Sequence, residues 1–189
     1  MNMERNHGEG DGDFKPSPEQ SEQLRVNSIV IPADEDGPLR QHQLAPSGLA
    51  ERQALVGGDI EGLMIGEPSA RLLMNEDGKL LQLPVNRRAT LLLWMHNKRL
   101  RYRDVLVGDV VVLGYPDEEG VDTSVPDELI SRLFSATQLR VETQGHGEAE
   151  WNTPSHAPFD NWLDAYDYAL HTGFRHHQLI ADVRVVPEE

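Results

Sequence analysis

The chain contains no cysteine among its 189 residues, which excludes disulfides, thiolate metal sites and cysteine-based catalysis. It also has no apolar run near the roughly 20 residues that a membrane-spanning helix requires. The first residues, Met1–Arg5, lack the apolar segment of a signal peptide. We therefore expect a cytoplasmic protein that makes no contact with a membrane.

Apolar residues and positive charge are both scarce. Hydrophobic residues make up 38% of the chain and the mean hydropathy is -0.51, which is low for a globular domain, so part of the chain is expected to lie outside the core. Lysine and arginine number 17 against 32 acidic residues, for a net charge of -15. Charge of this size favours solubility. Acidic mimicry of nucleic acid is the alternative interpretation.

The charge is unevenly distributed along the chain. Residues 1–24 hold six acids against two bases, residues 142–189 hold nine against two, and residues 25–141 are nearly balanced. Six basic residues of this middle stretch form what we call the basic island: Arg87, Arg88, Lys98, Arg99, Arg101 and Arg103.

Composition divides the chain into four segments. Residues 1–23 are rich in Gly, Asp, Glu, Ser and Pro, and we predict a disordered acidic tail because such a segment buries too little apolar surface to offset its ordering entropy. Residues 24–143 are expected to form the core domain. Residues 144–158 contain two glycines and two prolines and are expected to be a linker or loop. Residues 159–189 are predicted to be a C-terminal extension made of a helix and a strand.

Hydrophobic periodicity predicts an α+β fold with a small mixed or antiparallel sheet and three to four short helices. Strands are expected near residues 25–32, 59–65, 110–113, 138–143 and 179–186. Helices are expected near residues 49–56, 86–100, 129–134 and 159–173. Ser47 is the expected N-cap of the first helix, and Gly57-Gly58 and Gly173 are expected to end the first and the last.

The clearest local pattern predicts a β-hairpin. Two apolar arms, residues 70–74 and 79–83, flank the turn residues Asn75-Glu76-Asp77-Gly78. Pro84 closes this unit, and Asn86 is the predicted N-cap of the next helix.

The helix after Asn86 is predicted to carry a basic face. Its apolar positions recur at helical spacing, and Arg87, Arg88, Lys98 and Arg99 fall on the other side. Such a face can grip phosphates or an acidic partner. The alternative is a solvated or self-paired surface.

Gly57 and Gly58 raise the question of a phosphate-binding loop. Phosphate loops precede a helix, whose N-terminus then points at the anion, whereas here the helix comes first. Turn chemistry is therefore the simpler interpretation of both glycines. A pocket for an anionic small molecule such as a nucleotide, walled by these glycines and by Arg87 and Arg88, is the alternative.

Four residues of the last helix are weak candidates for metal ligands. Asp160, Asp164, Asp167 and His171 lie at i, i+4, i+7 and i+11, opposite an aromatic stripe, and carboxylate and imidazole groups ligate divalent metals. Acids early and histidine late are also what the helix dipole favours on a solvated face. We therefore expect no cofactor and no metal.

Four ordered motifs resemble an uncharacterised family, domain of unknown function 3846, over roughly residues 25–114. The motifs are Val56-Gly57-Gly58-x-Ile60-Glu61, Asn75-Glu76-x-Gly78-Lys79-Leu80, Leu83-Pro84-x-Asn86-x-x-Ala89-Thr90 and Val107-Gly108-Asp109-Val110. The resemblance implies a small accessory protein of a mobile element, as found in phages, plasmids and actinobacteria, and it supplies no catalytic residues.

Together these features predict a non-enzymatic cytoplasmic accessory protein that binds a protein or nucleic-acid partner. The basic helix face or the acidic helix is the expected contact surface. The alternatives are the pocket for an anionic small molecule and, third, a metal-dependent enzyme that uses Asp160, Asp164 and His171. The serines lack a nucleophile-elbow context, and no carboxylate pair stands out as general acid and base.

Overall fold

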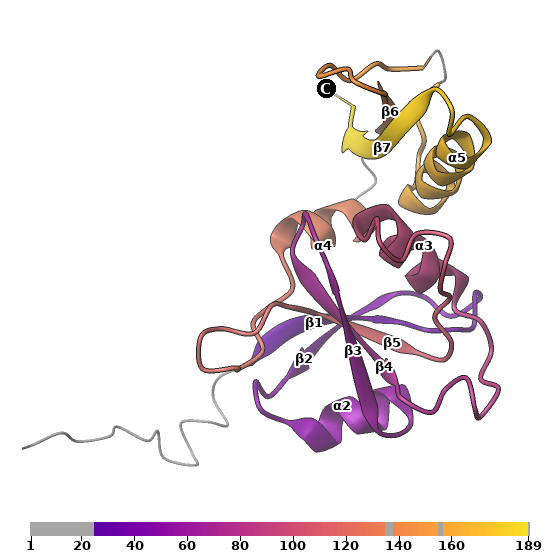
Figure 1. Cartoon of the computed structure of the whole chain (residues 1–189). Helices are drawn as coiled ribbons and strands as arrows, with labels where there is room; N and C mark the ends of the chain where they lie inside the picture. Colours follow the sequence, from indigo (N-terminus) through magenta and orange to yellow (C-terminus); the bar gives the residue numbers. More distant parts are fainter. Residues whose placement is uncertain (1–24, 135–137, 155–156, 189) are drawn as a thin grey trace, which may run out of the picture.

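The computed structural model describes residues 25–134, 138–154 and 157–188, and the predicted tail at residues 1–23 lies outside this range. Within the described residues the fold is α+β, with two sheets in which every strand pair is antiparallel. The antiparallel form of the prediction is therefore correct. We call residues 25–134 the core unit and residues 138–188 the C-terminal unit (Figure 1).

The core unit is built on a five-stranded sheet of order β2-β1-β5-β4-β3. Its elements are β1 (Val26–Ile31), β2 (Arg40–Leu44), α2 (Leu49–Val56), β3 (Ile60–Ile65), β4 (Ala70–Asn75), α3 (Arg87–His96), β5 (Val110–Gly114) and α4 (Asp127–Phe134). The central strand β5 is a fully buried valine-rich run, which favours a strand because β-branched side chains fit a pleated surface.

Alternation along the strands gives the sheet two apolar faces. On one face Leu73 and Val111 pack with Val56 of α2. On the other face Leu72 and Val112 join a larger cluster with α3, α4 and the C-terminal unit. Figure 1 shows the consequence: α2 lies on one side of the sheet, and α3 and α4 lie on the other.

The C-terminal unit pairs β6 (Leu139–Gly145) with β7 (Ile180–Pro187) and packs α5 (Trp162–Arg175) against both. One stripe of α5 is buried, and it consists of Trp162, Ala165, Tyr166, Ala169 and Leu170. This stripe shares one continuous cluster with α3, so the two units are joined by an apolar interface. The predicted domain boundaries at residues 143 and 158 stay a prediction.

The predicted hairpin of residues 70–74 and 79–83 is wrong. Strand β4 pairs with β3 on one side and β5 on the other, so it has no free edge for a third partner. Residues 79–83 form turns instead, in which the Leu83 N–H donates to the Gly78 carbonyl at 3.0 Å. The apolar character of this segment misled the prediction, since Leu80 is 83% exposed and Leu81 60% exposed.

Two boundary predictions also need correction, and one strand was missed. The N-cap of α2 is Gly48, with no side-chain hydrogen bond, rather than Ser47. Helix α5 continues through Gly173 and ends at Arg175. Gly173 allows close packing against β7, since a Cβ there would lie 3.0 Å from a methyl carbon of Val183. Strand β2 was not predicted, since its sequence Arg-Gln-His-Gln-Leu is polar and pairs through its backbone at the sheet edge.

The start of α3 follows the prediction closely. The buried Asn86 caps it by accepting a hydrogen bond from the Ala89 N–H, and its amide also donates to the carbonyls of Ile31 and Gly108. The helix ends at His96, however, and residues 97–103 form turns. None of the described helices has the length and apolar character that crossing a lipid bilayer requires.

Candidate functional site

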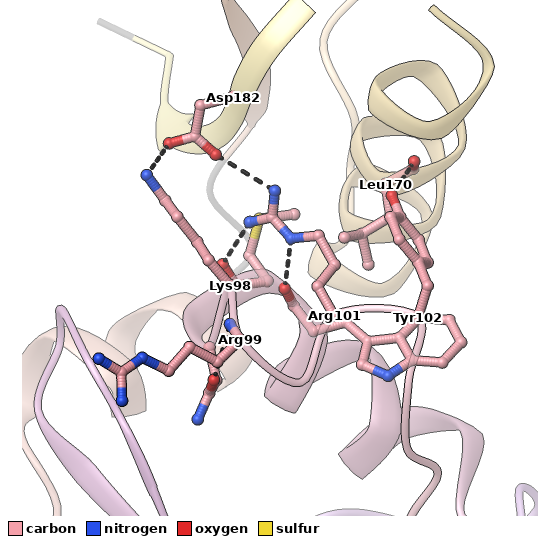
Figure 2. Close-up of polar contacts among 9 residues, drawn as sticks. Lys98, Arg99, Arg101, Tyr102, Leu170 and Asp182 are labelled. Atoms are coloured by element: carbon pink, nitrogen blue, oxygen red, sulfur yellow. Dashed lines mark hydrogen bonds and ion pairs between the residues drawn. The ribbon is translucent and has the colours of Figure 1, made fainter. Parts of the chain in front are cut away.

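The predicted basic helix face does not exist as one surface. Lys98 and Arg99 lie beyond the end of α3, so only Arg87 and Arg88 belong to the helix. Arg87 is half-exposed and forms an ion pair of 3.1 Å with Asp167 of α5. Arg99 is exposed, and within the described residues no partner is found for its guanidinium, which points away from its neighbours in Figure 2.

Arg88 is a structural residue. Its side chain is buried, and its guanidinium donates hydrogen bonds of 2.7–2.8 Å to the carbonyls of Pro32, Asp34 and Gly37. These three contacts fix the turn that follows β1 onto α3. The predicted ligand contact at Arg88 is therefore not available to a partner.

Gly57 and Gly58 also have structural roles, which depend on their backbone conformation and on the absence of a side chain. Gly57 ends α2 in the left-handed conformation at φ 76°, which favours glycine. A Cβ on Gly58 would lie 2.6 Å from the amide nitrogen of Asn75, whose side chain donates to the Gly57 carbonyl. Because α2 and α3 lie on opposite faces of the sheet, these glycines and Arg87 and Arg88 do not enclose a common pocket.

The acidic helix does not assemble a metal site. Asp160 precedes α5, Asp164 contacts the N-cap residue Asn161, and Asp167 pairs with Arg87. His171 is exposed on the next turn. Over the described part of the chain, no group of three or more His, Asp and Glu residues is arranged to hold a metal ion.

A groove of about 650 Å³ lies where the core unit meets the C-terminal unit. Its walls come from the β3–β4 turn, the end of α3 and the turn after it, α4, the loop before α5, and β7. The lining residues are Gly66, Glu67, Met95, His96, Lys98, Arg101, Glu128, Arg132, Trp151, Asp182, Val183, Arg184, Val185 and Val186. Four cations and three carboxylates are among them, so the lining carries one net positive charge.

Asp182 joins two members of the basic island across this groove (Figure 2). One oxygen of its carboxylate lies 2.5 Å from the Lys98 Nζ, and the other lies 3.2 Å from a guanidinium nitrogen of Arg101. The other two guanidinium nitrogens of Arg101 donate to the carbonyls of Trp94 and Met95 at 2.7 and 3.1 Å. Arg101 is therefore fixed, whereas Lys98 remains 71% exposed.

His96 and Tyr166 form a neutral pair beside these charges. The Nδ1 of His96 lies 2.8 Å from the Glu67 carbonyl, which only accepts, so Nδ1 carries the proton. The Nε2 therefore accepts a hydrogen bond of 2.7 Å from the Tyr166 hydroxyl. Burial, reinforced by the nearby Arg132 charge, lowers the pKa of His96 to about 4, and burial raises the pKa of Tyr166. Neither group titrates near neutral pH.

Aromatic and cationic contacts complete the surroundings of the groove. Tyr102, at a left-handed φ of 60°, stacks edge-on between Trp94 and Phe174, and its hydroxyl donates to the Leu170 carbonyl. On the other side Arg184 lies 4.3 Å from the ring centre of Trp151. The C-terminal unit thus supplies part of the groove wall and also holds the turn that carries Lys98 and Arg101.

Sequence reasoning missed Asp182, Arg132, Tyr166 and His96 as members of one site. His96 and Tyr166 lie among the apolar positions of α3 and α5, a pattern that indicates core packing only. Asp182 and Arg184 alternate with the buried Val183 and Val185, a pattern that marks the two charged residues as lying on the other face of β7. That signal says which face they occupy, but it does not say what lies opposite.

Comparison with known proteins identifies a family for the core unit. A family model described as Domain of unknown function (DUF3846) matches residues 26–138, more than half of the chain. No curated protein and no solved structure matches the chain. The match extends beyond the expected residue 114 through α4, and it ends where the C-terminal unit begins. The chain therefore belongs to the family of domains of unknown function DUF3846.

Proposed function

We propose that this protein is a non-enzymatic, cytoplasmic accessory protein, of the kind that mobile elements carry, and that it binds an acidic segment of a partner protein in the groove. The observation that carries the proposal is the gathering of Lys98, Arg101, Arg132 and Arg184 around one groove in a chain of net charge -15. The lining of the groove carries one net positive charge on a strongly acidic protein, and such a local excess of positive charge steers an oppositely charged partner to that place. Arg184 is itself paired with Glu142 at 2.6 Å.

The state of His96 supports a binding role over a catalytic one. A general base works best with a pKa near the working pH. His96 has a pKa of about 4 and both ring nitrogens in hydrogen bonds, so it is poorly suited to proton transfer at neutral pH.

The charge balance favours a peptide over nucleic acid as the partner. Proteins that bind nucleic acid neutralise a run of phosphates with a series of cations. In the groove Arg132 is paired with Glu128 at 2.6 Å, and Arg101 is held by Asp182 and two carbonyls. An occupant with a few carboxylates fits this limited supply of positive charge better than a polyphosphate chain does.

Binding of fluorescein-labelled octaglutamate, followed by fluorescence anisotropy at low and physiological salt, tests the proposal. Charge reversal of the exposed Lys98 (Lys98→Glu) is expected to weaken binding about tenfold or more. The matched control is Lys79→Glu, since Lys79 is also an exposed, ion-paired lysine but lies outside the groove. If labelled octathymidylate binds more tightly than octaglutamate, the partner is nucleic acid rather than an acidic peptide. If neither probe binds, the proposal is overturned.

An anionic small molecule is the second candidate, because the groove volume of about 650 Å³ falls within the usual range of ligand pockets. The groove replaces the predicted pocket at Gly57, Gly58, Arg87 and Arg88. Native mass spectrometry of the protein purified from its own host distinguishes the two candidates. A retained mass above 21.2 kDa that disappears in Lys98→Glu and remains in Lys79→Glu favours the small molecule.

A further inference from the structure

We infer that Asp182 is an internal competitor, which occupies the subsite that receives a carboxylate of the acidic partner. This inference rests on the proposed function and names the group of the partner that the groove recognises. It also predicts that the protein limits its own binding through a residue of its C-terminal unit.

The first step is the geometry of the subsite. Each oxygen of Asp182 contacts one cation, Lys98 at 2.5 Å and Arg101 at 3.2 Å (Figure 2). Because the other two nitrogens of Arg101 donate to the carbonyls of Trp94 and Met95, we expect this guanidinium to keep its position when Asp182 leaves. A preorganised cation of this kind binds an incoming carboxylate with little loss of side-chain entropy.

The second step is the origin of the carboxylate. Lys98 and Arg101 lie within residues 26–138, which the family model matches, whereas Asp182 lies beyond them on β7. A group from outside the family domain thus contacts the domain's cations in the way that a partner's carboxylate would.

The third step is the local backbone of Asp182. It is paired with Gln144, and the register of the β6–β7 ladder shifts between Gln144 and Gly145, immediately beside this pair. Such irregularities re-aim side chains and end regular pairing. Asp182 therefore lies at the irregular end of the β6–β7 ladder, where a change of its side-chain rotamer leaves the regular pairing intact.

The chemistry of the subsite fits a carboxylate. Lys98 and one guanidinium nitrogen of Arg101 each contact one oxygen of the two-oxygen group that occupies it. The same carboxylate chemistry is present in an acidic peptide and in a free dicarboxylate, and comparing octaglutamate with free glutarate distinguishes these two sources.

The test compares the full-length protein with Asp182→Asn and Asp167→Asn by octaglutamate anisotropy. Both variants remove one carboxylate that contacts the basic island, but Asp182 contacts two of its cations in the groove, whereas Asp167 contacts only Arg87 outside it. Asp182→Asn is expected to bind octaglutamate about tenfold more tightly than the wild-type protein, and Asp167→Asn within about twofold of it. Free glutarate is expected to compete only weakly, because it offers two carboxylates against eight.

The outcomes separate this inference from the proposed function. If the wild-type protein binds octaglutamate and Asp182→Asn binds no better than Asp167→Asn, the inference is overturned while the proposed function stands. If only Asp182→Asn binds, the inference holds and the proposed function fails for the wild-type chain. If neither binds, both are overturned. Equally strong binding of glutarate and octaglutamate overturns the peptide as the occupant.

A second variant keeps the inference testable if Asp182→Asn does not fold. Lys98→Met removes the exposed half of the subsite and leaves the Arg101–Asp182 pair in place. It is expected to weaken octaglutamate binding about fivefold, with Lys79→Met as the unaffected control. Equal affinities for the two methionine variants would remove Lys98 from the subsite and overturn the inference.

Discussion

The hydroxyl of Tyr166 donates a 2.7 Å hydrogen bond to the Nε2 of His96, and this bond joins α5 of the C-terminal unit to α3 of the family domain. Tyr166 donates in this direction only while His96 is neutral, because a doubly protonated ring has no acceptor. This one contact between the two units therefore depends on the protonation of His96.

Acidification is expected to weaken the fold through His96. The pKa of His96 lies at about 4 in the folded state and at the ordinary 6.5 in the unfolded state, so the unfolded chain binds more protons between these values. The contribution of His96 to the free energy of unfolding is fully present above about pH 6.5. It falls by about 1–3 kcal/mol as the pH drops to 4. Urea unfolding of the wild-type protein and of His96→Gln at pH 7 and pH 4 measures this loss of stability. The difference between the two proteins should shrink at pH 4, and the exposed His171→Gln serves as the control.

Replacement of Arg88 is expected to impair folding. Arg88→Met leaves the carbonyls of Pro32, Asp34 and Gly37 without their donor, at a cost of about 2–4 kcal/mol. Arg87→Met, which removes a half-exposed ion pair, should cost less than about 1 kcal/mol. Chemical denaturation of both variants provides the comparison, and equal losses would contradict a structural role for Arg88.

Gly58 and Asn75 are expected to be energetically coupled. A methyl group at residue 58 would meet the Asn75 amide nitrogen at 2.6 Å, so Gly58→Ala should cost about 1–3 kcal/mol. In an Asn75→Ala background the same change should cost much less, because the clash is gone. A double-mutant cycle from urea denaturation gives the coupling directly. Additive effects would show that Gly58 tolerates a side chain.

The exposed leucines of the turn after β4 are expected to contribute little to stability. Leu80→Lys should change the free energy of unfolding by no more than about 0.5 kcal/mol, since Leu80 is 83% exposed. Leu72→Ala, in the fully buried centre of β4, should cost about 2–5 kcal/mol. Thermal unfolding of the two variants distinguishes them. A large loss in Leu80→Lys would favour the predicted hairpin over the observed turns.

The sequence was most informative where a local signal decides a local structure. Asn86 was predicted as an N-cap and is one, because a side-chain amide one residue before a helix satisfies a free backbone N–H. The strand at the valine run of β5 and the helix end at Gly57 were predictable from the sequence for the same reason. The turns at residues 79–83 were not predictable, because the sequence does not reveal that both edges of β4 are occupied by β3 and β5.

The groove could not be predicted from the hydrophobic periodicity of the sequence. A repeat of 3.6 or two residues tells which side of an element is buried, but not which distant element covers it. Arg101 and Asp182 are 81 residues apart in the chain, and only the packing of α5, with β7 beside it, against α3 brings them together. The basic island was visible in the sequence, whereas the internal carboxylates that pair with it were not.

The position of β5 in the sheet has a consequence for synthesis of the chain. Its neighbours β1 and β4 are both made earlier, so until Val110–Gly114 emerges from the ribosome the core consists of two separate hairpins, each with an open edge. Open edges invite pairing with other chains. Nascent chains stalled before Val110 are therefore expected to be cut readily by protease, and chains that extend past Phe134 are expected to resist cleavage.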